Sequence, residues 1–177
     1  MSYSKVVCFD LEMCCWETAE ETGKKTGEII EIGLSKINLD KGEIIKRGQY
    51  YVKPEHDDIS PFCHELTGIT NKIIRKQGRP LELVLKSMVS NFGGQNAVYA
   101  AWGHDDLVLL NECNEKGLVM PFKNYLNLAL IDRVKNRRKT KVSQVDAMKE
   151  HGIKFEGKAH SGYVDAYNLS KLALKIL

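Results

Sequence analysis

The pattern of apolar and polar positions predicts three β-strands near the start of the chain. Short runs rich in Val and Ile occur at residues 5–12, 27–38 and 42–54, and runs of this length and composition are typical of strands. The turn signal Leu-Asp-Lys-Gly separates the second run from the third. These two strands are therefore expected to form an antiparallel pair.

Helical spacing appears further along the chain. Apolar residues recur three and four positions apart over 81–93, and this pattern stops at Gly93. The segment 124–132 is compatible with a strand and with the first turns of a helix, so periodicity leaves it open. The remaining expected elements are a short buried strand at 96–103 and helices at 105–118, 141–152 and 164–177.

The order of these elements predicts the fold class. Strands come first, and strands then alternate with helices, which favours an α/β arrangement with a mixed sheet flanked by helices. A chain of 177 residues fits one domain with a core of its own. We see no repeat, no low-complexity linker and no internal boundary, so we expect a single domain over residues 1–177.

The composition indicates the cellular compartment in which the protein is expected. The five cysteines are odd in number and none stands in a Cys-x-x-Cys pair, which favours free thiols in a reducing cytoplasm. Few apolar residues separate Lys5 from Asp10, too few for a signal peptide, and no apolar run reaches membrane-spanning length. We expect a soluble cytoplasmic protein that makes no membrane contact. The net charge of +3 is a weak indication of a polyanionic partner.

Two carboxylates, Asp10 and Glu12, follow directly on the apolar run 6–9. Residues two apart along a strand point the same way, so these acids would repel each other unless a cation lay between them. A divalent metal ion is the obvious candidate. In the alternative interpretation the strand ends at Phe9 and both acids lie in a solvated turn. The segment alone does not decide between them.

Acids also occur at two later positions that suit a functional site. Asp105 and Asp106 follow the expected strand at 96–103, and open α/β sheets bind ligands at the carboxyl ends of strands. The alternative role for either acid is to cap the following helix. Near the C-terminus, His160 precedes Asp165, which opens the last expected helix, and Gly162 between them allows a sharp bend. A capping or surface role is the alternative for His160.

Several motifs in this order resemble those of a known family. Phe-Asp-Leu-Glu at 9–12, Trp-Gly-His-Asp-Asp at 102–106 and His-Ser-Gly-Tyr-Val-Asp at 160–165 resemble the three motifs of the DEDDh 3′–5′ exonuclease superfamily. Ile-Ser-Pro-Phe-Cys-His-Glu-Leu-Thr-Gly-Ile-Thr at 59–70 and Cys-Cys-Trp-Glu at 14–17 resemble stretches of its subgroup of KapD-like proteins and histone-mRNA 3′-end exonucleases. The resemblance covers nearly the whole chain and implies a ribonuclease H-like fold.

The resemblance implies a role for each matching residue. The catalytic set would comprise four acids and one histidine, namely Asp10, Glu12, Asp106, Asp165 and His160. Asp105 stands where the family usually carries an aromatic residue, so a base-stacking role is not carried over to that position. Cys14 replaces the usual Thr and Val164 an Asp often seen there, but neither substitution touches the catalytic set.

These five residues suit metal-assisted hydrolysis of a phosphodiester. Carboxylates are the ligands that Mg²⁺ prefers, and two divalent ions about 3.5 to 4 Å apart can activate a water and stabilise the leaving 3′ oxygen. We expect Asp10, Glu12, Asp106 and Asp165 to hold two Mg²⁺ ions, with Mn²⁺ as a possible substitute. His160 would be the general base, because an unperturbed imidazole is largely neutral at neutral pH.

Substrate contacts follow in part from the resemblance. It implies that Leu11 and Met13 hold the terminal ribose and that Thr67 lies beside the last nucleotide. From the residues alone, Thr67 and Gly68 lie in a turn whose backbone could approach a ligand, and a plain turn before the helix around Ile73 is the alternative. Trp16 and Trp102 are candidates for stacking on bases, although Trp102 follows a strand and is equally suited to the core.

Two basic runs are candidates for binding phosphates. Residues 132–141 include Arg137 and Arg138 among six basic side chains, and residues 71–79 add four more. A charge run is commonly a solvated face. Beside a phosphodiesterase site, contact with a nucleic-acid backbone is the favoured interpretation.

Together these features predict a metal-dependent 3′–5′ exonuclease that releases nucleoside 5′-monophosphates from single-stranded nucleic acid, with RNA favoured over DNA as the partner. A DNA-directed exonuclease would use the same five residues. A nucleic-acid-binding or scaffold protein without turnover is the alternative from another class, and the intact catalytic set argues against it.

Overall fold

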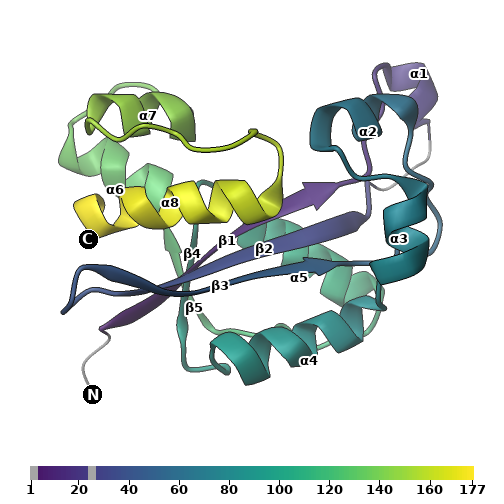
Figure 1. The fold of residues 1–177 in the computed structure, drawn as a ribbon, viewed down its shortest axis with the longest axis horizontal. Helices are drawn as coiled ribbons and strands as arrows, with labels where there is room; N and C mark the ends of the chain where they lie inside the picture. Colours follow the sequence, from purple (N-terminus) through teal and green to yellow (C-terminus); the bar gives the residue numbers. More distant parts are fainter. Residues whose placement is uncertain (1–3, 24–26) are drawn as a thin grey trace.

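A five-stranded mixed sheet organises the chain in the computed structural model, which describes residues 4–23 and 27–177 (Figure 1). The strand order is β3-β2-β1-β4-β5. Strand β1 pairs antiparallel with β2, β2 pairs antiparallel with β3, and β4 runs parallel to both β1 and β5. The strands are β1 Lys5–Met13, β2 Ile29–Asn38, β3 Glu43–Tyr51, β4 Val98–Ala101 and β5 Asn124–Asn127. The mixed sheet and the antiparallel pair that the sequence predicts are confirmed.

Helices cover both faces of this sheet. In Figure 1, α6, α7 and α8 lie on one face, α4 and α5 lie on the other, and α2 and α3 lie beyond the end at which β1 terminates. The helices are α1 Ala19–Thr22, α2 Pro61–Thr67, α3 Asn71–Gln77, α4 Leu81–Phe92, α5 Asp105–Glu115, α6 Leu128–Lys135, α7 Gln144–Glu150 and α8 Gly162–Ile176. The open segment 124–132 contains both elements, β5 followed by α6. None of the helices traced in residues 4–23 and 27–177 is long and apolar enough to cross a bilayer.

Side chains along β1 alternate between the two faces of the sheet, and this alternation determines the face on which Asp10 and Glu12 lie. Val7 and Phe9 pack with residues of α4 and α5, whereas Val6 and Cys8 pack with residues of α8. Because side chains of a strand alternate between faces, Asp10 and Glu12 continue the second series and point to the α8 face. Strand β1 runs through to Met13, so the acids belong to the strand and do not lie in a solvated turn.

Two glycines allow α8 to approach this face closely. A Cβ atom at Gly33 of β2 would lie 1.9 Å from the carbonyl carbon of Gly162, the first residue of α8. A Cβ atom at Gly162 would lie 3.1 Å from the carbonyl oxygen of Asp10. Any larger residue at Gly33 would push the helix away from the sheet. The start of α8 is therefore held directly against the strands that carry the acids.

Candidate functional site

Three acids from two elements meet at the end of β1. Asp10 and Glu12 come from the strand and Asp165 from the first turn of α8, and each offers a carboxylate oxygen within 4.8 Å of the others. Glu12 is buried, while Asp10 and Asp165 are partly exposed. Hard divalent cations prefer clustered carboxylates of this kind. The donor set therefore suits a Mg²⁺-like ion.

The electrostatics of this cluster also favour a cation. Burial raises the pKa of Asp10 well above its usual value, and neighbouring acids raise it further. Burial, followed by Glu31 and other acids, raises the pKa of Glu12 to about 8. Burial likewise raises the pKa of Asp165, although the N–H groups of His160 and Ser161 oppose this. The charged neighbours that act on Asp10 and Glu12 among the described residues are acids, namely Glu31, Asp105, Asp165 and, for Asp10, Glu12. A bound cation would relieve their repulsion.

The second acid motif lies beside this cluster, where β4 ends and α5 begins. Asp105 is near enough for its charge to raise the pKa of both Asp10 and Glu12. Asp106 lies 3.9 Å from His104, measured from Oδ1 to Nδ1, and its buried Oδ1 has no hydrogen-bond partner within residues 4–23 and 27–177. A buried carboxylate oxygen without a donor is costly, and a metal ion or a metal-bound water would satisfy it. Asp106 is not part of the group of three acids whose oxygens lie within 4.8 Å.

His160 lies in the loop that leads into α8, with an exposed side chain. Its backbone is left-handed, with φ of 63°, which is uncommon for a residue other than glycine and is often found at functional sites. The bend expected at Gly162 lies instead at His160, while Gly162 allows the close approach of α8 to Gly33. A cavity of about 600 Å³ adjoins His160, and Phe62 and Lys158 line part of it.

The residues predicted to bind the terminal nucleotide lie around this end of the sheet. Met13 ends β1 with an exposed side chain, whereas Leu11 packs against the core on the α4 and α5 face. Thr67 is buried; its hydroxyl donates to the Cys63 carbonyl (2.8 Å) and accepts from the Ile69 N–H (3.0 Å). These bonds stabilise the end of α2, and contact between Thr67 and a nucleotide stays a prediction.

The two tryptophans have different settings. Trp102 packs between two clusters of the core, and its Nε1 donates to the Val142 carbonyl at 3.1 Å. The core interpretation of Trp102 is therefore correct. Trp16 packs in part against the small cluster of Ile59 and Cys63 and lines a cavity of about 530 Å³. Its position leaves base stacking as a prediction.

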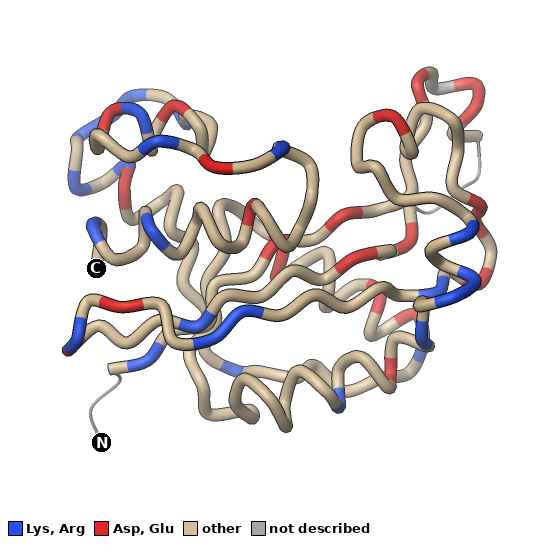
Figure 2. Tube along the Cα trace, in the orientation of Figure 1, with Lys and Arg blue, Asp and Glu red and all other residues tan. Residues whose placement is uncertain are grey.

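The basic run 132–141 is largely committed to interactions within the protein. Arg138 pairs with Asp132 (3.0 Å) and with Glu150, while Arg133 donates to the carbonyls of Arg138 and Lys139. Arg137 is exposed with a left-handed backbone. Figure 2 shows further basic residues on α3, at the opposite end of this view from α6 and α7. Arg138 is therefore poorly placed to bind phosphate, because its guanidinium already has two acidic partners.

Lys141, the last residue of this run, lies near Asp105 at the start of α5. Its ammonium would lie 3.5 Å from a Cβ atom at Gly103, and its charge opposes the burial that raises the pKa of Asp105 to about 6. The number of basic residues in the run does not distinguish Lys141 from Arg138. Lys141 lies near Asp105 because the segment before α7 packs beside the end of β4, where Trp102 donates to the Val142 carbonyl.

Glu31 is a further acid at the site that sequence reasoning missed. It lies on β2 opposite Glu12 in the strand register and is 1% exposed. The available signal was a charged residue between Ile30 and Ile32, inside the otherwise uncharged and largely apolar first half of the strand. A charge at such a position requires partners on the covered face, and the structure supplies them from α8.

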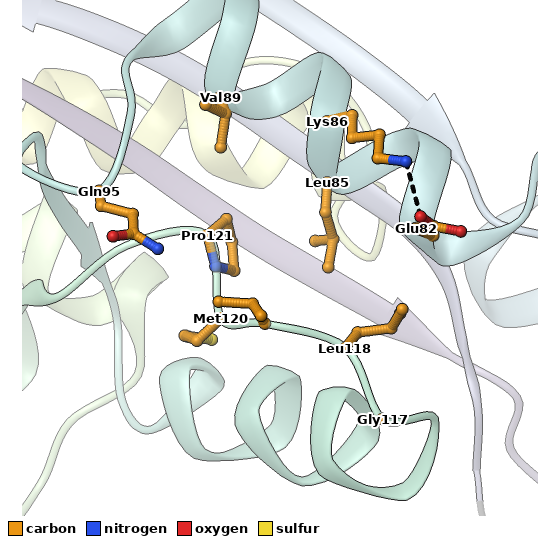
Figure 3. Close-up of a pocket in the computed structure, with 10 residues that line it drawn as sticks. Glu82, Leu85, Lys86, Val89, Gln95, Gly117, Leu118, Met120 and Pro121 are labelled. Carbon is orange, nitrogen blue, oxygen red and sulfur yellow. Dashed lines mark hydrogen bonds and ion pairs between the residues drawn. The ribbon is translucent and has the colours of Figure 1, made fainter.

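A further cavity lies on the opposite face of the sheet. It occupies about 450 Å³ between α4 and the segment 117–121 (Figure 3). Leu85, Val89 and Met120 are among the side chains that line it, and the Lys86–Glu82 ion pair (2.6 Å) lies at its edge. None of the clustered acids lines this cavity, so the chemistry is assigned to the α8 face.

Acids at the carboxyl ends of the parallel strands β1 and β4, together with a histidine before the last helix, define a metal-dependent nuclease of the DEDDh type. The family model RNase_T, described as an exonuclease, matches residues 7–173. The chain therefore belongs to this exonuclease family, within the DEDDh 3′–5′ exonucleases.

Individual relatives agree with this assignment. The 3′–5′ exonuclease Snipper of Drosophila melanogaster is 32% identical over 99% of this chain and 70% of its own length. ERI1 exoribonuclease 2 of Danio rerio is 30% identical over 99% of this chain, which spans 35% of that relative.

Solved structures show the same fold. The full-length 3′-exonuclease has a TM-score of 0.84 at 24% identity, with 99% of this chain and 82% of that chain covered. The nuclease domain of 3′hExo bound to rAMP has a TM-score of 0.82 at 24% identity, with 98% and 91% covered. The ribonuclease H-like fold predicted from the motifs is confirmed.

Proposed function

We propose that this chain is a metal-dependent 3′–5′ exonuclease that acts on single-stranded RNA and releases nucleoside 5′-monophosphates. The observation that carries the proposal is the meeting of Asp10, Glu12 and Asp165 within 4.8 Å. Membership of the exonuclease family supports it, and the relatives named above are an exonuclease and an exoribonuclease. The proposed domain spans residues 1–177, and the five free thiols support the cytoplasm as its location.

Asp10, Glu12 and Asp165 are the proposed ligands of two Mg²⁺ ions, and Asp106 completes the set. Bound in pairs, such ions supply an activated water and stabilise charge on the leaving 3′ oxygen. The fit is supported by the oxygen donors, their mutual repulsion and the unpartnered Oδ1 of Asp106. Mn²⁺ has a similar preference for carboxylate oxygens and would substitute.

His160 is the proposed general base. Its imidazole takes a proton from the water whose oxygen attacks the terminal phosphorus. The bond between phosphorus and the 3′ oxygen of the preceding nucleotide then breaks, and that oxygen ends as the 3′ hydroxyl of the shortened strand. Asp165 accepts from the Ser161 N–H at 3.1 Å, so one carboxylate both faces the cluster and holds the loop that carries His160.

We propose that the terminal nucleotide binds beside His160, between α2 and the loop before α8. The cavity of about 600 Å³ in this place supports the proposal. Met13, the backbone at Leu11 and the turn at Thr67 are the proposed contacts of the ribose and last nucleotide, with Trp16 as a stacking surface. For the phosphates we favour Arg137 and Lys141, because Arg138 is engaged by Asp132 and Glu150.

A direct assay tests the proposal. Single-stranded RNA labelled at its 5′ end is incubated with the protein in Mg²⁺ or in EDTA, beside DNA of the same sequence and an RNA hairpin. We expect stepwise shortening from the 3′ end in Mg²⁺ alone, nucleoside 5′-monophosphates as product, and no activity in Asp10→Asn. Equal or faster shortening of DNA would refute the preference for RNA. Binding without shortening would identify a nucleic-acid-binding protein that lacks turnover.

A further inference from the structure

The side chain of Glu31 joins β2 to the start of α8. Its Oε2 accepts a hydrogen bond from the Gly162 N–H (3.2 Å), and its Oε1 accepts from the Tyr163 N–H (2.9 Å). Gln49 of β3 donates its side-chain amide to the same Oε1 at 2.8 Å. Both carboxylate oxygens are thus engaged by N–H donors, so Glu31 is satisfied without a metal or a substrate.

The two N–H groups that Glu31 accepts are among those that a helix cannot satisfy within itself. The first turn of an α-helix has no preceding carbonyls to accept its N–H groups. A side chain at the N-cap commonly does so, but Ser161, the N-cap of α8, makes no such hydrogen bond. Glu31 therefore caps α8 from another element, 131 positions away from Gly162 in the sequence.

The capped turn carries the residues on which the proposed chemistry depends. Asp165 belongs to this turn, and its oxygen lies within 4.8 Å of Asp10 and Glu12. His160 precedes the capped Gly162 by two positions. We propose that Glu31 is a positioning residue, which fixes the start of α8 so that Asp165 and His160 face the acids of β1. This inference rests on the proposed exonuclease function.

A carboxylate at position 31 has an electrostatic cost that an uncharged cap would avoid. Glu31 adds a negative charge beside Asp10, Glu12 and Asp165, and each of them has its pKa raised by it. A serine at the N-cap would satisfy an N–H group without that repulsion. A carboxylate can accept from two adjacent N–H groups at once, and this fixes both the position and the direction of the helix.

Glu28 provides a matched control on the same chain segment. It is 4% exposed, and its carboxylate also accepts from consecutive backbone N–H groups, those of Glu55, His56 and Asp57. It is not among the charges that act on Asp10 or Glu12. Substitution of Glu28 therefore removes a comparable set of hydrogen bonds to a buried carboxylate, whose partners lie in the segment 55–57 and at Lys116 and not in α8.

The experiment compares Glu31→Ala with Glu28→Ala and Glu31→Gln with Glu28→Gln, with kcat and KM measured on a short single-stranded RNA in Mg²⁺. We expect Glu31→Ala to lower kcat by about 100-fold, the effect of a misplacement near 1 Å, while KM changes by less than about threefold. Glu31→Gln retains one accepting oxygen and should recover part of the lost kcat. Glu28→Ala and Glu28→Gln should lower the melting temperature and leave kcat unchanged.

Hydrogen exchange provides a readout that does not depend on activity. The amide protons of Gly162 and Tyr163 should exchange faster in Glu31→Ala than in the wild type, and no faster in Glu28→Ala. A wild type that cleaves no nucleic acid would refute the proposed function, while the exchange result would still report on the cap. Unchanged exchange in Glu31→Ala, or equal kcat in Glu31→Ala and Glu28→Ala, would overturn the positioning role.

Discussion

Glu12 offers a measurement of the electrostatic cost of the acid cluster in the absence of metal. The perturbation is Glu12→Gln, which keeps the shape of the side chain and removes its charge. Burial and neighbouring acids raise the pKa of Glu12 from 4.5 to about 8 in the folded chain. Between pH 4.5 and about pH 8, Glu12 keeps its proton in the folded chain and has released it in the unfolded chain. The free energy of unfolding of the wild type therefore falls as the pH rises.

The magnitude follows from that difference in pKa. Each pH unit corresponds to about 1.4 kcal/mol for one proton, so ionisation of Glu12 costs the metal-free folded chain up to about 5 kcal/mol. At pH 5 the side chain is protonated in the folded wild type, which should then resemble Glu12→Gln in stability. Above pH 8 the charge is present, and the variant should be the more stable protein by several kcal/mol.

Urea unfolding in EDTA at pH 5, 7 and 9 measures these differences. Glu28→Gln is the control, because backbone N–H groups and Lys116 outweigh burial and lower the pKa of Glu28 below 4.5. The stability that Glu28 contributes is present above pH 4.5 and should be constant from pH 5 to 9. Addition of Mg²⁺ should abolish the wild-type loss at pH 9. A difference between wild type and Glu12→Gln that does not vary with pH would refute the reasoning.

Three further predictions concern single side chains. His160→Ala should lower the rate by about 10²- to 10⁴-fold and retain Mn²⁺ affinity by calorimetry; an unchanged rate would make His160 structural. Asp106→Ala should be inactive and Asp105→Ala should lose far less, and the reverse pattern would move the second acid by one residue. Lys141→Ala should make the slope of log affinity for single-stranded RNA against log salt shallower by about 0.7. Arg138→Ala should lower the melting temperature and leave that slope unchanged, and a shallower slope would show that Arg138 binds phosphate.

Local patterns were sufficient to predict the features that depend on neighbouring residues in the chain. The period of two along β1 places Asp10 and Glu12 on one face, and the structure has both on the face that α8 covers. The turn at 39–42 predicts the antiparallel pair of β2 and β3. These features depend on contacts between close positions, where alternation and turn chemistry act directly.

Features that depend on distant contacts were not accessible in this way. Arg138 loses its role as a candidate phosphate ligand because α6 and α7 bring Asp132 and Glu150 beside it. Charge along the sequence does not record that packing. Glu31 likewise looks like a charge without a partner among the isoleucines of β2 until Gly162 is placed next to it.

The attachment of α8 to the sheet explains what holds Asp165 beside Asp10 and Glu12. Ser170 of the helix shares a hydrogen bond of 2.8 Å with Ser35 of β2, and the guanidinium of Arg47 on β3 lies 4.1 and 3.9 Å from the ring centres of Tyr163 and Tyr167. These contacts come from β2 and β3, whereas the acids that α8 must meet belong to β1. Repulsion between Asp165 and the β1 acids therefore acts against contacts that anchor the helix to β2 and β3 between Tyr163 and Ser170.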